Sequence, residues 1–115
     1  MQTNRAYRLI LPLALSTAAT LASADMKPAE ISAARELFNN NGCASCHEIS
    51  GKSAGPALRD VSKRYKGKRV EAELATRIRE GSIGRWGNDE AHPPMGMLDP
   101  EEAKLLANWV LSGAP

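Results

Sequence analysis

The chain has 115 residues, of which 43% are hydrophobic and only 4% are aromatic. This length suits one small domain, and domains of this size are marginally stable unless something besides side chains helps to fill the core. The sequence has no internal repeat and no low-complexity linker, which excludes repeat proteins and linked arrays of domains.

Residues 1–24 have the three parts of a secretory signal peptide. Arg5 and Arg8 supply the positive start, and an apolar run and an Ala-Ser-Ala cleavage site follow. The run is too short and too rich in polar residues to span a membrane comfortably. We therefore expect cleavage before Asp25, export to the periplasm and a mature domain of residues 25–115, with an uncleaved membrane anchor as the alternative.

Export also changes the charge of the protein. Loss of Arg5 and Arg8 takes the 15 basic residues to 13, which equals the 13 acidic residues. A mature chain without net charge gives no reason to expect a nucleic-acid partner. Residues 59–69 carry a cluster of basic side chains, which we interpret as a solvated face or, alternatively, as a docking surface for an acidic partner.

The mature sequence predicts helices and no strand. The first helix runs from about Pro28 to Asn40, because proline suits a first turn and because Ile31 and Phe38 are spaced for one face. The asparagine-rich stretch that follows ends this helix before Gly42.

The segment Cys43-Ala44-Ser45-Cys46-His47 has the C-x-x-C-H pattern of a c-type haem attachment site. Two thiols three positions apart can add to the two vinyl groups of one porphyrin, and the imidazole of His47 can bind its iron. Both cysteines of the chain lie in this motif, so the chain can hold one haem at most. A covalently attached apolar macrocycle would also complete the core of this small domain.

Three other uses of the cysteine pair compete with haem attachment. A zinc site needs two more soft ligands, and His92 is the only histidine outside the motif. A redox dithiol is expected beside a βαβ pattern, which the sequence lacks, and its thiols could not also carry haem. A disulfide across two residues would stabilise little. Haem attachment is favoured, and a thiol–disulfide oxidoreductase stays an alternative.

Two short helices are predicted after the motif. The first runs from about Ala57 to Tyr65 and follows Gly55-Pro56. The second runs from about Val70 to Glu80 and has its apolar residues spaced for one face, with a glycine directly after it.

The sequence from Ser82 to Leu98 is expected to be a loop, since it has three glycines, two prolines and no hydrophobic period. The last helix begins at Asp99, which forms a capping box with Glu102, and it ends near Gly113.

With these features the chain resembles the class I cytochromes c, in particular the short bacterial periplasmic group often called cytochrome c-551. The resemblance covers residues 25–115 and implies an all-α fold of four or so short helices wrapped around one covalently bound haem c. It also implies that Phe38 and Trp109 meet where the first and last helices cross. It is carried by Leu37-Phe38 ahead of Gly42-Cys43, by Gly55-Pro56, by the stretch from Arg77 to Gly87 and by Ala107-Asn108-Trp109-Val110-Leu111.

The resemblance gives roles to five residues. Cys43 and Cys46 would form the thioether bonds, and His47 would be the proximal ligand. The carbonyl of Pro56 would accept a hydrogen bond from the other nitrogen of that imidazole and so fix its orientation. The indole N–H of Trp86 would meet a haem propionate, with plain core packing as the alternative.

The sixth ligand is where this sequence departs from the family pattern. Family members usually have methionine directly before Pro-Pro, whereas His92 precedes Pro93-Pro94 here and Met95 and Met97 follow. We expect Met95 to be the distal ligand, because a thioether is the ligand that the family favours and it raises the reduction potential. His92 would give a bis-imidazole iron of lower potential, and Met97 is the third candidate, although it is expected to pack as core.

The resemblance implies a periplasmic one-electron carrier and not an enzyme. Protein ligands on both sides of the iron leave no site for substrate, and the iron can change oxidation state with little rearrangement. The implied partners are respiratory redox enzymes, such as a quinol-oxidising complex and a terminal oxidase or nitrite reductase, which a monomer without stable membrane insertion would meet in brief docking. If no candidate holds the iron, the open sixth site would indicate a ligand-binding or peroxidase-like haem protein.

Overall fold

A computed structural model describes residues 25–87 and 91–115, so the predicted signal peptide lies outside the described residues. Within these ranges the chain forms four α-helices, one short 3₁₀ helix and a two-stranded sheet. The elements are α1 (Pro28–Asn40), η1 (Cys43–Ser45), α2 (Leu58–Arg64), α3 (Glu71–Glu80), β1 (Ser82–Ile83), β2 (Ala91–His92) and α4 (Pro100–Leu111). The four helices lie within one or two residues of their predicted bounds, and the predicted all-α fold is confirmed.

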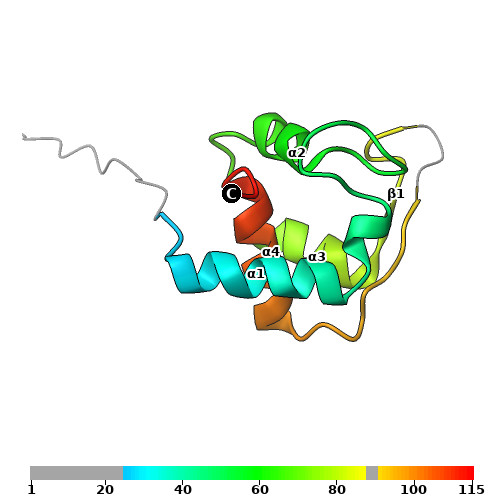
Figure 1. Cartoon of the computed structure of the whole chain (residues 1–115). Helices are drawn as coiled ribbons and strands as arrows, with labels where there is room; N and C mark the ends of the chain where they lie inside the picture. Colours follow the sequence, from blue (N-terminus) through cyan, green and yellow to red (C-terminus); the bar gives the residue numbers. More distant parts are fainter. Residues whose placement is uncertain (1–24, 88–90) are drawn as a thin grey trace, which may run out of the picture.

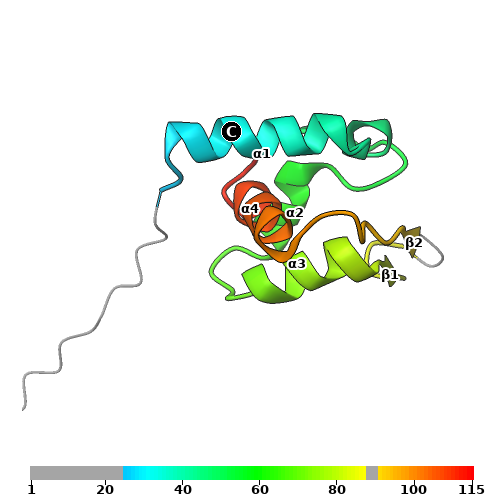
Figure 2. The same ribbon diagram turned by 90° about the horizontal axis from the view of Figure 1, so that it is seen from below.

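Helix α4 is the centre of the packing. It contacts α1, α2 and α3, and Figure 2 shows it between α1 and α3. The C-terminal end of α1 and the small sheet lie at the same end of the molecule (Figures 1 and 2). No helix in the described ranges is long and apolar enough to cross a membrane.

An aromatic pair joins α1 to α4. The rings of Phe38 and Trp109 have centroids 5.4 Å apart and are tilted by 58°. Trp109 is only 1% exposed, and its indole N–H donates a hydrogen bond to the carbonyl of Pro115 at 3.0 Å. A tilted aromatic pair of this kind is worth about 0.5–1.5 kcal/mol beyond the area that it buries. The predicted crossing of the first and last helices is confirmed.

Helices α3 and α4 pack through small side chains. Ala75 of α3 lies in one buried cluster with Ala103 and Ala107 of α4. Because alanine has only a methyl group, these positions let the two helices approach closely, and Leu74 and Ile78 of α3 pack around the cluster.

The predicted capping box of the last helix is present. The backbone N–H of Glu102 donates to the Asp99 carboxylate at 2.8 Å, and the backbone N–H of Asp99 donates to the Glu102 carboxylate at 2.9 Å. Pro100 lies in the first turn of the helix. Proline suits this position, because a backbone N–H there would have no partner within the helix. These contacts fix where the central helix begins.

The prediction that residues 82–98 form only loop is wrong at two short segments. β1 pairs antiparallel with β2, so that Ser82 lies opposite His92 and Ile83 opposite Ala91. Two-residue strands have no hydrophobic period that a sequence could reveal. Gly81 makes the pairing possible, because its backbone has φ of +82° and a Cβ there would lie 2.7 Å from the carbonyl oxygen of His92.

We predict that Asp99→Ala lowers the free energy of unfolding by about 0.5–2 kcal/mol, because the N–H of Glu102 loses its acceptor. Urea unfolding of the holoprotein, followed by circular dichroism, measures this loss. Glu101→Ala is the matched control, since Glu101 is an exposed acidic residue of the same turn outside the capping box. Equal losses in the two variants would contradict the role of the box.

Candidate functional site

A cavity of about 510 Å³ lies at the end of the molecule where α1 ends and the small sheet begins. This volume is within the range of about 300–1,000 Å³ that is typical of cofactor and small-molecule sites. Its apolar walls come from α1, α2, α3 and α4, through Phe38, Leu58, Val61, Leu74, Ile78, Leu106 and Val110. The helices thus enclose a space that an apolar group could fill.

The C-x-x-C-H motif forms one side of this cavity. The backbone N–H groups of Cys46 and His47 both donate to the carbonyl of Cys43, at 3.1 and 3.0 Å. This tight turn places Cys43, Cys46 and His47 together in the cavity lining. The two thiols are not joined as a disulfide.

The imidazole of His47 is held in one orientation. Its Nδ1 lies 2.8 Å from the carbonyl oxygen of Pro56, and because a carbonyl only accepts, Nδ1 carries the proton. Nε2 is then left with the lone pair that a metal requires. The hydrogen bond implied by the family resemblance is therefore present.

Gly55 leaves room for this ring. A Cβ at residue 55 would lie 2.6 Å from Cε1 of His47 and 3.0 Å from Nδ1, closer than side-chain carbons approach in proteins. The backbone N–H of Gly55 also donates to the carbonyl of Cys46 at 2.6 Å. The Gly55-Pro56 pair thus both admits and orients the imidazole.

The chemistry of the thiols argues against the competing uses of the motif. Burial raises the pKa of the Cys43 thiol, whereas an attacking thiol in a dithiol oxidoreductase needs a lowered pKa. Across residues 25–87 and 91–115, no three histidine, cysteine or acidic side chains gather in a way that could hold a metal ion by themselves. A zinc site therefore finds no support in this part of the chain.

The three candidates for the distal ligand have different environments. His92 and Met95 are half-buried and line the cavity. Met97 is 71% exposed, so the prediction that it packs as core is wrong. The physical reason is a turn in which the N–H of Leu98 donates to the carbonyl of Met95, so that Leu98 is the residue of this turn that enters the core.

The ring of His92 lies near the ring of His47. The ring centroids of His47 and His92 are 6.1 Å apart, and the rings are tilted by 36°. Nδ1 of His92 is buried and has no hydrogen-bond partner. Burial lowers the pKa of His92, and the nearby His47 lowers it further. The backbone of Pro93 raises this pKa, but by less. The neutral imidazole, which is the form that binds metals, is therefore favoured.

Met95 is tied into the core as well as into the cavity wall. Its backbone N–H donates to the carbonyl of Ile78 at 3.1 Å, and its side chain packs against the main buried cluster. The expectation that Met95 is the distal ligand stays a prediction.

Polar side chains gather on another part of the cavity wall. Trp86, Arg77 and Arg85 line it together with Tyr65. The guanidinium of Arg64 lies 4.4 Å from the centre of the Trp86 ring and donates to the carbonyl of Arg85 at 2.7 Å. A stacked cation of this kind holds the indole in place.

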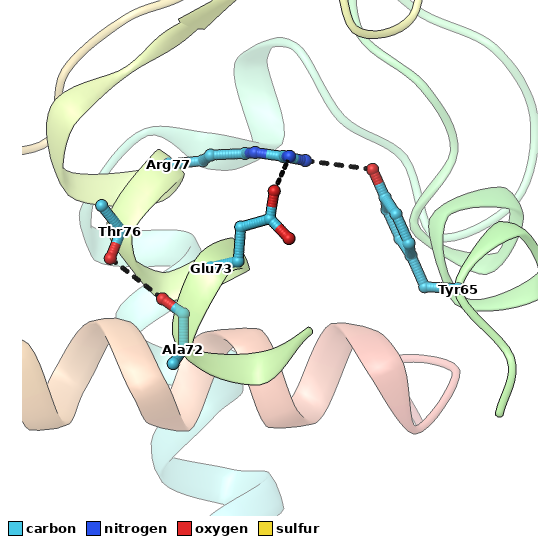
Figure 3. Close-up of polar contacts among 5 residues, drawn as sticks. All are labelled: Tyr65, Ala72, Glu73, Thr76 and Arg77. Carbon is cyan, nitrogen blue, oxygen red and sulfur yellow. Dashed lines mark hydrogen bonds and ion pairs between the residues drawn. The ribbon is translucent and has the colours of Figure 1, made fainter. Parts of the chain in front are cut away.

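Arg77 is a residue that the sequence analysis did not single out. Figure 3 shows its guanidinium between the carboxylate of Glu73 and the hydroxyl of Tyr65, to which it donates at 3.1 Å. In the same helix Thr76 donates to the carbonyl of Ala72 at 3.0 Å (Figure 3). The signal in the sequence was Glu73 four residues before Arg77, a spacing that places the two side chains on one helix face, whereas the cavity beside them appears only in the tertiary structure.

These features fit one haem. The cavity offers apolar walls for a macrocycle, two thiols and an oriented imidazole on one side, and two arginines whose guanidinium groups suit carboxylates. Cys43, Cys46, His47, Trp86 and both half-buried distal candidates are brought together, and Met97 is not.

Known proteins resemble this chain in sequence and in fold. The family model described as Cytochrome c matches residues 31–114. Cytochrome c-551 of Pseudomonas aeruginosa is 49% identical over 77 residues, which cover 66% of this chain and 72% of that protein. Cytochrome c-552 of Hydrogenobacter thermophilus is 41% identical over 67% of this chain and 78% of its own length. The crystal structure of cytochrome c552 from Nitrosomonas europaea superposes with a TM-score of 0.63 at 38% identity, over 68% of this chain and 96% of that one.

We predict that Gly55→Ala displaces the His47 ring, weakens its hydrogen bond to Pro56 and lowers the free energy of unfolding of the holoprotein by about 1–3 kcal/mol. Denaturant unfolding followed at the haem absorption band measures the loss. Gly96→Ala is the matched control, because a Cβ at residue 96 meets nothing within 4 Å. A Gly55→Ala protein as stable as Gly96→Ala would contradict the steric role of Gly55.

Proposed function

This chain belongs to the cytochrome c family, and we propose that it carries single electrons between respiratory redox enzymes in the periplasm. The observation that supports this most directly is the apolar cavity that has Cys43, Cys46 and the oriented His47 on one side. Haem c bound through the two cysteines supplies an iron that alternates between the ferrous and ferric states. The protein's task is to hold that iron, exclude water from it and leave its coordination unchanged.

Each part of the cavity contributes to this task. His47 would hold the iron through Nε2, and its hydrogen bond to Pro56 fixes the ring and makes Nε2 a better donor. The apolar side chains of the four helices exclude water, so the charge of the iron changes in a medium of low dielectric constant. His92 and Met95 line the cavity as the candidates for the second ligand. A rigid site of this kind needs little rearrangement when an electron arrives or leaves.

We assign the polar part of the cavity wall to the haem propionates. Arg77 and Arg85 offer guanidinium groups, which bind carboxylates with two parallel hydrogen bonds. Trp86 offers an indole N–H beside them, held in place by Arg64. Packing alone is the alternative role for Trp86.

Transient docking is the mode of interaction that we propose, with the protein as a monomer. The basic side chains of residues 59–69 include exposed ones such as Lys63, which lies 3.8 Å from Asp60 in a weak surface ion pair. Such a cluster can steer an encounter with an acidic face of a redox enzyme and still release it quickly.

The competing function is a ligand-binding or peroxidase-like haem protein with an open sixth position. It needs a distal side without a protein ligand. Two side chains with suitable donor atoms, His92 and Met95, line this cavity, which favours a closed site and a function without catalysis.

We predict that the protein, produced in a host that matures c-type cytochromes, is exported and begins at Asp25. Mass spectrometry should find the mass of the 91-residue mature chain plus one haem. The ferrous form should have a low-spin spectrum that carbon monoxide does not change, and the protein should cycle between both oxidation states without loss. Absence of covalent haem, or a high-spin ferrous form that binds carbon monoxide, would overturn the proposed function.

A further inference from the structure

The geometry points to His92, and not Met95, as the distal ligand, so we infer that the iron is held between two histidines. This inference rests on the proposed haem site and says how its second side is closed. It also differs from the expectation drawn from the family pattern, in which a methionine has this role.

The separation of the two imidazoles is the first argument. Imidazole–metal bonds in proteins are about 2.0–2.1 Å long. When two imidazoles bind one metal from opposite sides, their ring centres are therefore about 6 Å apart, because each ring adds the distance from its centre to its nitrogen. The observed distance between the ring centroids of His47 and His92 is 6.1 Å. The 36° tilt is compatible with this arrangement, because each ring can turn about its own bond to the metal.

The hydrogen bonding of His92 is the second argument. A buried polar atom normally has a partner, and leaving it without one costs free energy. Nδ1 of His92 is buried and has no partner among the described residues. His47 and Pro56 show the contrast, since Nδ1 of His47 is fully used in its hydrogen bond. The imidazole of His92 therefore lines the cavity with one nitrogen that no hydrogen bond among the described residues uses.

The backbone around His92 is the third argument. His92 is held opposite Ser82 in the sheet, and Pro93-Pro94 directly after it restrict the backbone dihedral angles. Gly81 lies so close to the carbonyl of His92 that a Cβ at residue 81 would be 2.7 Å from its oxygen. A ligand on such a constrained segment loses little entropy when it binds.

The contacts of Met95 lead to a different role. Its side chain packs against the main buried cluster, and the carbonyl of Ile78 holds its backbone. Methionine fills irregular gaps in cores, and these contacts give Met95 a packing role of this kind. Met95 then forms part of the wall beside the distal histidine.

The first test uses the unmodified holoprotein. The ferric form should be low-spin and should lack the charge-transfer band that a thioether–iron bond gives at the red end of the visible spectrum. Electron paramagnetic resonance should show the low-spin signal of two imidazoles. A thioether band in a low-spin protein with covalent haem would overturn this inference and leave the proposed function intact, whereas missing haem or an open iron would overturn the proposed function.

Substitutions separate the two candidates further. His92→Ala should yield a high-spin form that binds carbon monoxide, and added imidazole should restore the low-spin spectrum. Met95→Leu should keep the low-spin spectrum with closed coordination, as should the control Met97→Leu, whose side chain lies outside the cavity lining. A Met95→Leu protein that binds carbon monoxide while His92→Ala does not would overturn the inference.

His92→Met provides a gain-of-signal test that does not depend on loss of folding. The thioether band should appear, and the reduction potential should rise above that of the unmodified protein, because a thioether ligand favours the ferrous state. If the potential and the spectrum of His92→Met equal those of the unmodified protein, His92 is not bound to the iron.

Discussion

The hydrogen bond from His47 to the carbonyl of Pro56 is the contact on which the arrangement of the site depends. It joins the C-x-x-C-H turn to the start of α2, and it does so together with the backbone bonds from Gly55 to Cys46 and from Leu58 to Glu48. The three contacts close the intervening loop over the imidazole. One short segment therefore fixes the proton on Nδ1, the direction of Nε2 and the position of the first helix that follows the motif.

The packing of the helices serves the same cavity. Several side chains that belong to the buried cluster also line the cavity, among them Phe38, Val61, Leu106 and Val110. The core of this small chain is thus open on one side, where a cofactor completes it. This agrees with the sparse aromatic content, because a bound macrocycle can supply the apolar surface that the sequence does not. Folding of the domain and binding of the cofactor are then coupled.

The sequence predicted the helices and the hydrogen-bond partner of His47 well, because both are determined by local signals. Periodic apolar residues and the Asp99 capping box define α4, and Gly55-Pro56 indicates the partner of His47. The polar wall around Arg77 and the pairing of His92 with Ser82 depend on contacts between segments far apart in the chain. No periodicity or spacing reports such contacts.

The small sheet links the position of His92 to the register of its two strands. β1 and β2 are each two residues long and are joined by seven residues. In a strand, a slip of one residue turns every side chain to the opposite face. A shift of one residue in the pairing of Ser82 with His92 would thus turn the imidazole of His92 away from the ring of His47. The register of these two short strands thus determines which side chain of the segment is presented to the cavity.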